Sequence, residues 1–179
     1  MSGGEIERRV GAIDWFRVST DLDAQGWAIL PNLLSQAEAD SIAGLYGQEA
    51  GFRSRVMMAR HGFGRGEYRY FSYPLPDMIQ RLRASAYRQL APIANRWQER
   101  LGQEVRFPDD HPAFLERCHQ AGQVRPTPLL LEYGPDDYNC LHRDLYGEHV
   151  FPLQIAVLLD EPGEDFTGGE FVMTEQRPR

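Results

Sequence analysis

The segment His142-Arg-Asp144 holds two side chains of the kinds that bind metal ions. The surrounding residues 138–145 have the alternation that predicts a β-strand, in which neighbouring side chains point to opposite faces. His142 and Asp144 are therefore expected on one face and Arg143 on the other. One imidazole and one carboxylate are two of the three ligands of the 2-His-1-carboxylate site, which binds iron(II) and leaves positions open for a chelating cosubstrate and dioxygen. A His-x-Asp pattern also arises often by chance, so alone it is a weak indication of a metal site.

The elements that position this pair are predicted to be short strands that follow a helical region. Apolar residues at helical spacing, together with capping residues, predict helices over residues 14–25, 35–48, 77–101 and 112–121, with a short strand at 27–30. The period then changes, and strands are expected at 129–133, 138–145, 151–159 and 169–174, with turns at 134–137 and 160–163. Helices first and antiparallel strands afterwards predict an α+β fold with a mainly β core.

Residues 51–73 differ from the rest of the chain in composition. Five arginines face a single acid, Glu67, and aromatic residues and glycines are interleaved with them. The segment is predicted to form loops or a short ribbon that is mobile or poorly packed. Either its arginines and aromatic rings contact a substrate, or its rings pack on the helices and its arginines are solvated.

The bulk composition limits the class of protein. The chain has 179 residues with 42% hydrophobic and 25% charged residues, which suits a single globular domain. Its two cysteines are too few for a disulfide framework, and no apolar run is long enough to cross a membrane, so a cytoplasmic location is expected. A net charge of -7 disfavours non-specific nucleic-acid binding over the whole surface, although one local patch stays open. All 19 basic residues are arginine, which excludes a lysine-dependent mechanism.

The stretch from Pro128 to Asp144 resembles the strand–turn–strand of iron(II)- and 2-oxoglutarate-dependent dioxygenases of the prolyl-hydroxylase-like and alkylation-repair kinds. The strand at 151–159 with the following Phe166-Thr-Gly-Gly-Glu-Phe171, and residues 26–35, are also similar to segments of these enzymes. The resemblance implies a double-stranded β-helix, or jelly roll, with helices of about residues 1–124 outside a core that starts near 125 and continues beyond the end of the chain. It implies iron(II) and 2-oxoglutarate as cofactors, with ascorbate as an accessory reductant.

The resemblance also assigns roles to individual residues. His142 and Asp144 would bind iron, and Tyr133 would contact the cosubstrate, unless it is an ordinary strand tyrosine. Gln154, a polar residue in an apolar strand, would point into the barrel mouth beside the cosubstrate or else face solvent. In alkylation-repair enzymes a segment ahead of the barrel contacts the damaged base, and that implies substrate-binding roles for four residues of the basic segment: Arg55, Arg60, Arg65 and Tyr68.

The chain departs from the family pattern after Asp144. The distal iron-binding histidine and the basic residue that pairs with the far carboxylate of 2-oxoglutarate are missing at usable spacing, since His149 is too close to Asp144. We therefore expect these 179 residues alone to be inactive. The substrate is left open between nucleic-acid bases and a protein or amino-acid side chain, and the oligomeric state is not predicted. A β-sandwich binding module without catalysis is the alternative class.

Overall fold

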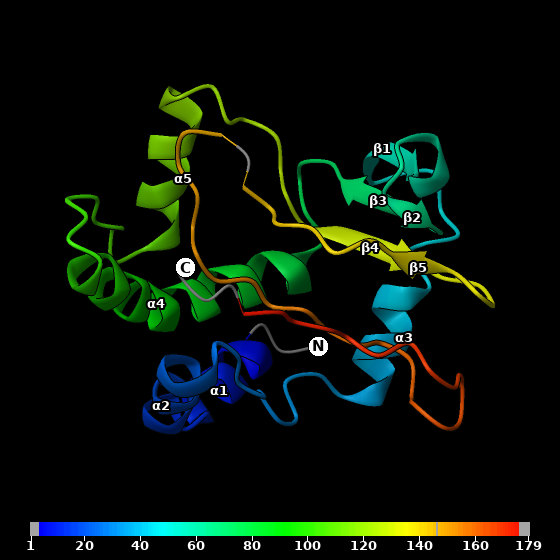
Figure 1. Cartoon of the computed structure of the whole chain (residues 1–179), viewed down its shortest axis with the longest axis horizontal. Helices are drawn as coiled ribbons and strands as arrows, with labels where there is room; N and C mark the ends of the chain where they lie inside the picture. The colour runs from blue at the N-terminus through cyan, green and yellow to red at the C-terminus, as the bar shows by residue number, and fades with distance from the viewer. Residues whose placement is uncertain (1–3, 146, 176–179) are drawn as a thin grey trace.

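The computed structural model describes residues 4–145 and 147–175, and Figure 1 shows two groups of elements. Four helices form one group, and two small sheets with a short helix form the other. The helical elements are α1 (Glu5–Ala12), α2 (Trp15–Gln25), α3 (Gln36–Ala43), the 3-10 turn η1 (Met58–Arg60), α4 (Asp77–Arg100) and α5 (His111–Gln120). The strands are β1 (Phe52–Met57), β2 (Gly64–Arg65), β3 (Glu67–Phe71), β4 (Leu129–Glu132) and β5 (Tyr138–Asn139).

Local capping explains where the predicted helices begin and end. The Asp14 side chain accepts a 3.0 Å hydrogen bond from the Arg17 backbone at the start of α2, and Gly26 ends that helix with a φ of 81°. Ser35 and Glu38 form a complete capping box on α3, and Asp110 caps α5. These boundaries confirm the predicted starts, but α3 ends at Ala43 instead of continuing to residue 48. Helix α1 was missed, because its eight residues are too few for a clear apolar period.

Helix α4 is the central support of the helical group. Ala91 and Ala94 are completely buried within its 24 residues, and they pack in a cluster with Phe114 and Cys118 of α5. Pro92 lies between the two alanines on the exposed side, where the missing backbone N–H and the ring meet solvent, and the helix continues past it. The predicted helix over 77–101 is therefore confirmed.

The basic segment forms antiparallel strands, which confirms the short ribbon among the two predicted alternatives, while its mobility stays a prediction. Strand β3 is the middle strand of the antiparallel order β1-β3-β4. Phe71 at its end is 1% exposed and packs in a cluster with Leu75 and Leu130. Six residues of β1 alternate between half-buried and exposed. Glycines and charges obscured this period of two in the sequence.

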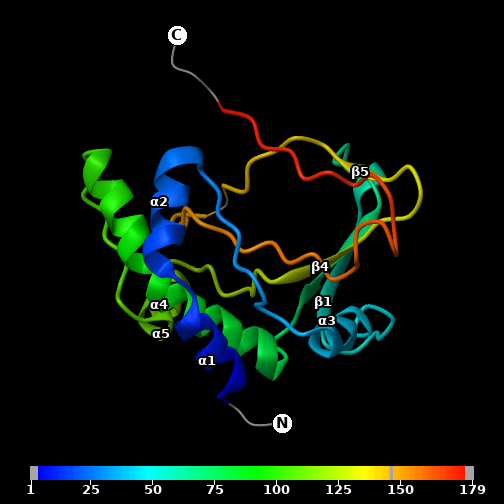
Figure 2. The same ribbon diagram turned by 90° about the horizontal axis from the view of Figure 1, so that it is seen from below.

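The C-terminal segments pair less than predicted. Strand β4 confirms the strand at 129–133, but β5 covers only two residues of 138–145. Residues 27–30, 151–159 and 169–174 have no strand assignment. The extended run from 151 lies between the helical group and the sheets (Figure 2), and its alternate side chains Phe151, Leu153 and Ile155 pack on the α4 cluster of Ala86, Leu90 and Ile93. Apolar alternation decides which side chains turn inward, but a strand also needs a partner backbone.

The described residues therefore make a mixed α and β structure with small antiparallel sheets, and neither sheet closes into a barrel in residues 4–145 and 147–175. The jelly roll stays a prediction. In the same ranges, no helix combines the length and the apolar character needed to cross a membrane.

Candidate active site

The side chains of His142 and Asp144 converge just after strand β5. His142 Nε2 lies 3.5 Å from Asp144 Oδ1, and both side chains are partly exposed, at 48% and 41%. They follow the end of the β5 ladder but keep the same-face relationship that an extended chain imposes. The structure thus brings together the two residues predicted to bind iron.

A backbone carbonyl determines which nitrogen of His142 faces the carboxylate in the neutral ring. His142 Nδ1 lies 2.8 Å from the Cys140 carbonyl oxygen, which can only accept a hydrogen bond. Nδ1 is therefore the protonated nitrogen, and the lone pair of Nε2 points towards Asp144 Oδ1. Two acceptors that face each other favour a cation, or a proton on Nε2, between them.

Asp144 is held from its other side. Gln154 Nε2 donates a 2.9 Å hydrogen bond to Asp144 Oδ2, which leaves Oδ1 directed at His142. Polar partners behind a histidine and a carboxylate are what orients metal ligands in proteins. Gln154, predicted to bind the cosubstrate, thus contacts the candidate ligand itself.

The donor set fits a metal ion. Two ligands about 2.1 Å from one ion and at right angles to each other lie about 3 Å apart, close to the observed 3.5 Å. Among the residues that the structure describes, no group of three His, Cys, Asp or Glu side chains could hold an ion. The backbone of His149 pairs with the Gln123 amide: its N–H donates to Gln123 Oε1 at 2.8 Å and its carbonyl accepts from Gln123 Nε2 at 3.1 Å. His142 and Asp144 are therefore the two candidate ligands in the described part of the chain.

Tyr133 lines a cavity of about 500 Å³ beside Gly66, next to the end of β4. Arg65, Asp137 and Gly66 also line it. A Cβ atom on Gly66 would lie 2.8 Å from the Tyr133 ring, at a φ of +108° that favours glycine, so Gly66 allows the ring to approach the backbone. Burial raises the pKa of the Tyr133 phenol, which therefore stays protonated near neutral pH.

The four residues predicted to bind substrate fall into two pairs. Arg55 forms an ion pair with the buried Glu67, with Nε 2.9 and 3.0 Å from its two carboxylate oxygens. The guanidinium of Arg55 lowers the pKa of Glu67, and the Tyr46 hydroxyl donates to the same carboxylate at 2.6 Å. Tyr68 is half-buried in β3, 5.5 Å edge-on from Tyr70. This pair belongs to the packing of the sheet.

Arg60 and Arg65 form the other pair and are exposed in the connection between β1 and β3. This connection also carries residues that sequence reasoning missed. Phe63 is 44% exposed, and Tyr138 on the neighbouring strand is 56% exposed. The interleaved rings and arginines were a signal for Phe63, but no local pattern connects residue 138 to residue 65.

Residues 66–179 match a protein family, Oxygenase-NA, described as an oxygenase catalysing oxidative methylation of damaged DNA. The match covers more than half of the chain. This chain belongs to the Oxygenase-NA family. The matched range contains Tyr133, His142, Asp144 and Gln154. Membership in an oxygenase family favours an enzyme over a binding module.

Two curated relatives of this Oxygenase-NA chain come from Mycobacterium tuberculosis. They are the uncharacterized protein MT2286 of strain CDC 1551 / Oshkosh and the uncharacterized protein Rv2227 of strain ATCC 25618 / H37Rv. Each is 51% identical over 109 residues, which is 61% of this chain and 47% of the relative. The chain thus spans about half the length of the curated relatives it matches. No solved structure matches the chain.

Proposed function

We propose that this Oxygenase-NA chain is the iron- and cosubstrate-binding part of an iron(II)- and 2-oxoglutarate-dependent oxygenase that oxidises methyl groups on damaged DNA bases. One observation carries the assignment of the site. His142 Nε2 and Asp144 Oδ1 face each other at 3.5 Å, while the Cys140 carbonyl and the Gln154 amide hold the two side chains from behind.

The electrostatics of this pair suit a divalent cation. A neutral imidazole and one carboxylate bring a single negative charge to the site, so a bound iron(II) ion keeps a net positive charge that attracts an anionic, chelating cosubstrate. A bound iron(II) ion would supply the activation of dioxygen. In this reaction 2-oxoglutarate loses carbon dioxide, one oxygen atom is incorporated into succinate, and the other is inserted into the substrate C–H bond. The part played by His142 and Asp144 is to bind and orient the ion.

Tyr133 is proposed to contact the cosubstrate. Its protonated phenol is a hydrogen-bond donor that a carboxylate accepts, and it lies at a cavity that Arg65 and Gly66 also line. Glu132 and Asp137 line the same cavity and oppose an anion there, so the phenol must donate directly to the carboxylate. Ascorbate would serve only to keep the iron reduced.

Damaged DNA as the substrate is supported by the family description and by the exposed arginines of the sheet connection. Hydroxylation of a methyl group on a base nitrogen would release it as formaldehyde. Because the chain has a net charge of -7 and repels DNA as a whole, DNA must bind at a local surface that carries arginines.

Metal binding tests the site directly. Anaerobic titration of iron(II) into the chain is expected to give one site, which is lost in His142→Ala and in Asp144→Ala. His119→Ala is the matched control, because His119 is exposed on α5, away from the pair. Equal iron affinity in the unsubstituted protein and in both site variants would contradict the assignment of His142 and Asp144 as iron ligands.

Turnover tests the reaction. Succinate and formaldehyde release are measured with iron(II), ascorbate, 2-oxoglutarate and a methylated oligonucleotide, both for the 179-residue chain and for the longest form that its gene encodes. We expect turnover in the longer form and its loss in His142→Ala. Turnover by the 179 residues alone would show that their protein ligands suffice, and iron-independent turnover would contradict the proposal.

A further inference from the structure

A groove runs between two extended segments of the chain that form no sheet. One wall is residues 28–30, and the other is residues 154–159 of the run that packs on α4. The cavity between them has a volume of about 590 Å³ and is also lined by aliphatic residues at the start of α3: Leu33, Leu34 and Ala39. Ile29 and Leu158 line it and are 72% and 63% exposed, so the groove opens to solvent.

The backbone of both walls lacks partners. Within the residues that the structure describes, the amides and carbonyls of 28–30 and 155–159 make no hydrogen bond to another protein group. An extended backbone with a row of unpaired N–H and C=O groups is a template for a strand of another chain. Two such backbones that line one groove can each form a ladder with a strand placed between them. The groove therefore fits an extended peptide.

The side chains of the groove select the kind of peptide. Most of them are aliphatic, and among the described residues no arginine and no aromatic ring lines the cavity. The charged residues that line it, Asp160 and Glu161, are both acidic. An anionic ligand is therefore disfavoured, and a strand with large apolar side chains is favoured.

The chain carries a matching run of its own at residues 169–174. This run has no strand assignment, makes no backbone hydrogen bond within the described residues, and does not line the groove of its own copy. Phe171, Val172 and Met173 are 80%, 60% and 55% exposed, and Figure 2 shows the run, in red, along one side of the molecule. Consecutive large apolar side chains at a surface indicate a contact that the single chain leaves unmade.

We infer that two copies of this chain associate by exchanging this run, so that residues 169–174 of each copy lie in the groove of the other. Phe171 and Met173, which share a face of an extended segment, enter among the aliphatic side chains, while the backbone pairs with both walls. Each copy has one groove and one run, so the contact is self-complementary and closes as a two-fold dimer. The inference does not depend on the proposed function.

The apolar area is sufficient for a specific dimer. Six large apolar side chains of the walls and the run are at least 40% exposed: Ile29, Val157, Leu158, Phe171, Val172 and Met173. Each has roughly 60–100 Å² to bury, so two copies bury on the order of 1,000 Å² from these side chains alone. This area reaches the lower end of specific interfaces and predicts a dissociation constant in the micromolar range.

Sedimentation velocity at increasing protein concentration measures the association. We expect a monomer at low concentration and a dimer at high concentration. Sodium chloride is expected to strengthen the dimer, because Glu170 of the run and the two acids of the groove repel each other and salt screens this repulsion. A dimer that dissociates with added salt would contradict an apolar contact of this kind.

One substitution in each half of the contact tests the assignment. Phe171→Ser and Ile29→Ser are each expected to raise the dissociation constant about tenfold or more, since a two-fold dimer contains every substitution twice. Both side chains are exposed in the single chain, so the monomer is expected to keep its midpoint of thermal unfolding.

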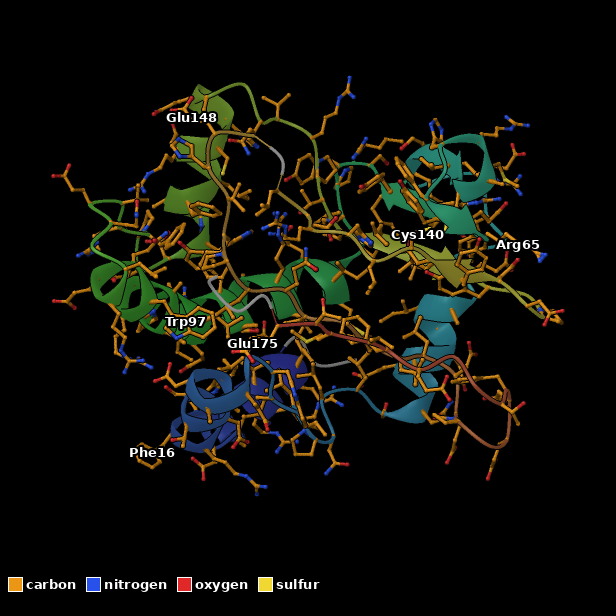
Figure 3. All side chains as sticks on the ribbon, in the orientation of Figure 1. Phe16, Arg65, Trp97, Cys140, Glu148 and Glu175 are labelled. Atoms are coloured by element: carbon orange, nitrogen blue, oxygen red, sulfur yellow. The ribbon has the colours of Figure 1, made fainter. Side chains whose placement is uncertain are left out.

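Matched controls remove equally exposed apolar side chains elsewhere. Phe16→Ser and Leu101→Ser remove side chains that are 84% and 71% exposed. Figure 3 shows Phe16 at the outer edge of α2, whereas Glu175, which follows the run, lies near the middle of the view. Both controls are expected to leave the dissociation constant unchanged, and equal weakening in all four variants would show adhesion without a defined contact.

Hydrogen exchange shows whether strands pair in the dimer. The amides of 28–30, 155–159 and 169–174 are expected to exchange more slowly above the dissociation constant than below it. A monomer at every concentration up to about 100 µM overturns the inference, and so does a dimer without this protection. Neither result bears on the iron titration, which tests the proposed function by itself.

Discussion

Gln154 Nε2 donates a 2.9 Å hydrogen bond to Asp144 Oδ2, between two segments that share no strand pairing. The contact joins the extended run that packs on α4 to the segment that follows β5. It gives Asp144 one preferred orientation, with Oδ1 towards His142. The helical group thus positions a candidate ligand through a single amide side chain.

Removing that amide should weaken the iron site without removing a ligand. Gln154→Leu is expected to lower iron(II) affinity about tenfold in anaerobic titrations, because the carboxylate loses the partner that orients it. Gln120→Leu is the matched control, since Gln120 Nε2 donates a comparable 3.0 Å bond to Glu116 on α5. An unchanged affinity in Gln154→Leu would show that Asp144 does not depend on this partner.

Arg55 should matter for stability and not for DNA binding. Arg55→Met removes the cation that pairs with the buried Glu67 and leaves its carboxylate with the hydrogen bond from the Tyr46 hydroxyl. The midpoint of thermal unfolding is expected to fall by a few degrees, while oligonucleotide affinity stays the same. Arg65→Met is expected to leave the midpoint of thermal unfolding unchanged and to lower the oligonucleotide affinity. A loss of DNA affinity in Arg55→Met at unchanged stability would return Arg55 to the substrate site.

Buried His111 predicts a fall in stability in mild acid. It is 2% exposed, its Nδ1 has no hydrogen-bond partner, and burial lowers its pKa to about 4. His111 takes up a proton near pH 6.5 in the unfolded chain and only near pH 4 in the folded chain. Its contribution to the free energy of unfolding is therefore complete above pH 6.5 and is lost as the pH falls towards 4. The loss is on the order of 3 kcal/mol.

Chemical unfolding between pH 7 and pH 4 measures this effect. His111→Phe keeps a ring beside Tyr87 and is expected to flatten the pH dependence in this window. His119→Phe, on the exposed side of the same helix, is expected to leave the curve unchanged. Parallel curves for the unsubstituted protein and His111→Phe would exclude His111 as the titrating group.

Gly64 should be far more sensitive to substitution than Gly62. Both have a positive φ, of 125° and 70°, but a Cβ atom on Gly62 meets nothing within 4 Å whereas one on Gly64 meets the Tyr138 carbonyl oxygen at 2.1 Å. Gly62→Ala adds backbone strain alone and is expected to lower the free energy of unfolding by about 1 kcal/mol. Gly64→Ala is expected to cost more and to separate β2 from β5, as seen by hydrogen exchange at the Cys140 amide. Equal costs for the two variants would show that the close approach is not maintained in solution.

Local chemistry in the sequence determined several features of this protein. Asp14, Ser35 and Asp110 set helix starts through their own side chains, and Gly26 ends α2. The extended backbone after β5 is enough to put His142 and Asp144 on one side, because residues two apart share a face. Such features depend on neighbours within a few residues, which a sequence pattern records.

The tertiary structure decided which partners those residues meet. Arg55 and Arg65 look alike in the sequence, but the pairing of β1 with β3 directs Arg55 to Glu67, and the pairing of β2 with β5 leaves Arg65 beside Tyr138. The segment at 151–159 has the alternation of a strand, but it forms no sheet pairing in the described residues. Strand pairing and ion pairing join residues far apart in the chain, and their choice depends on packing that no local pattern contains.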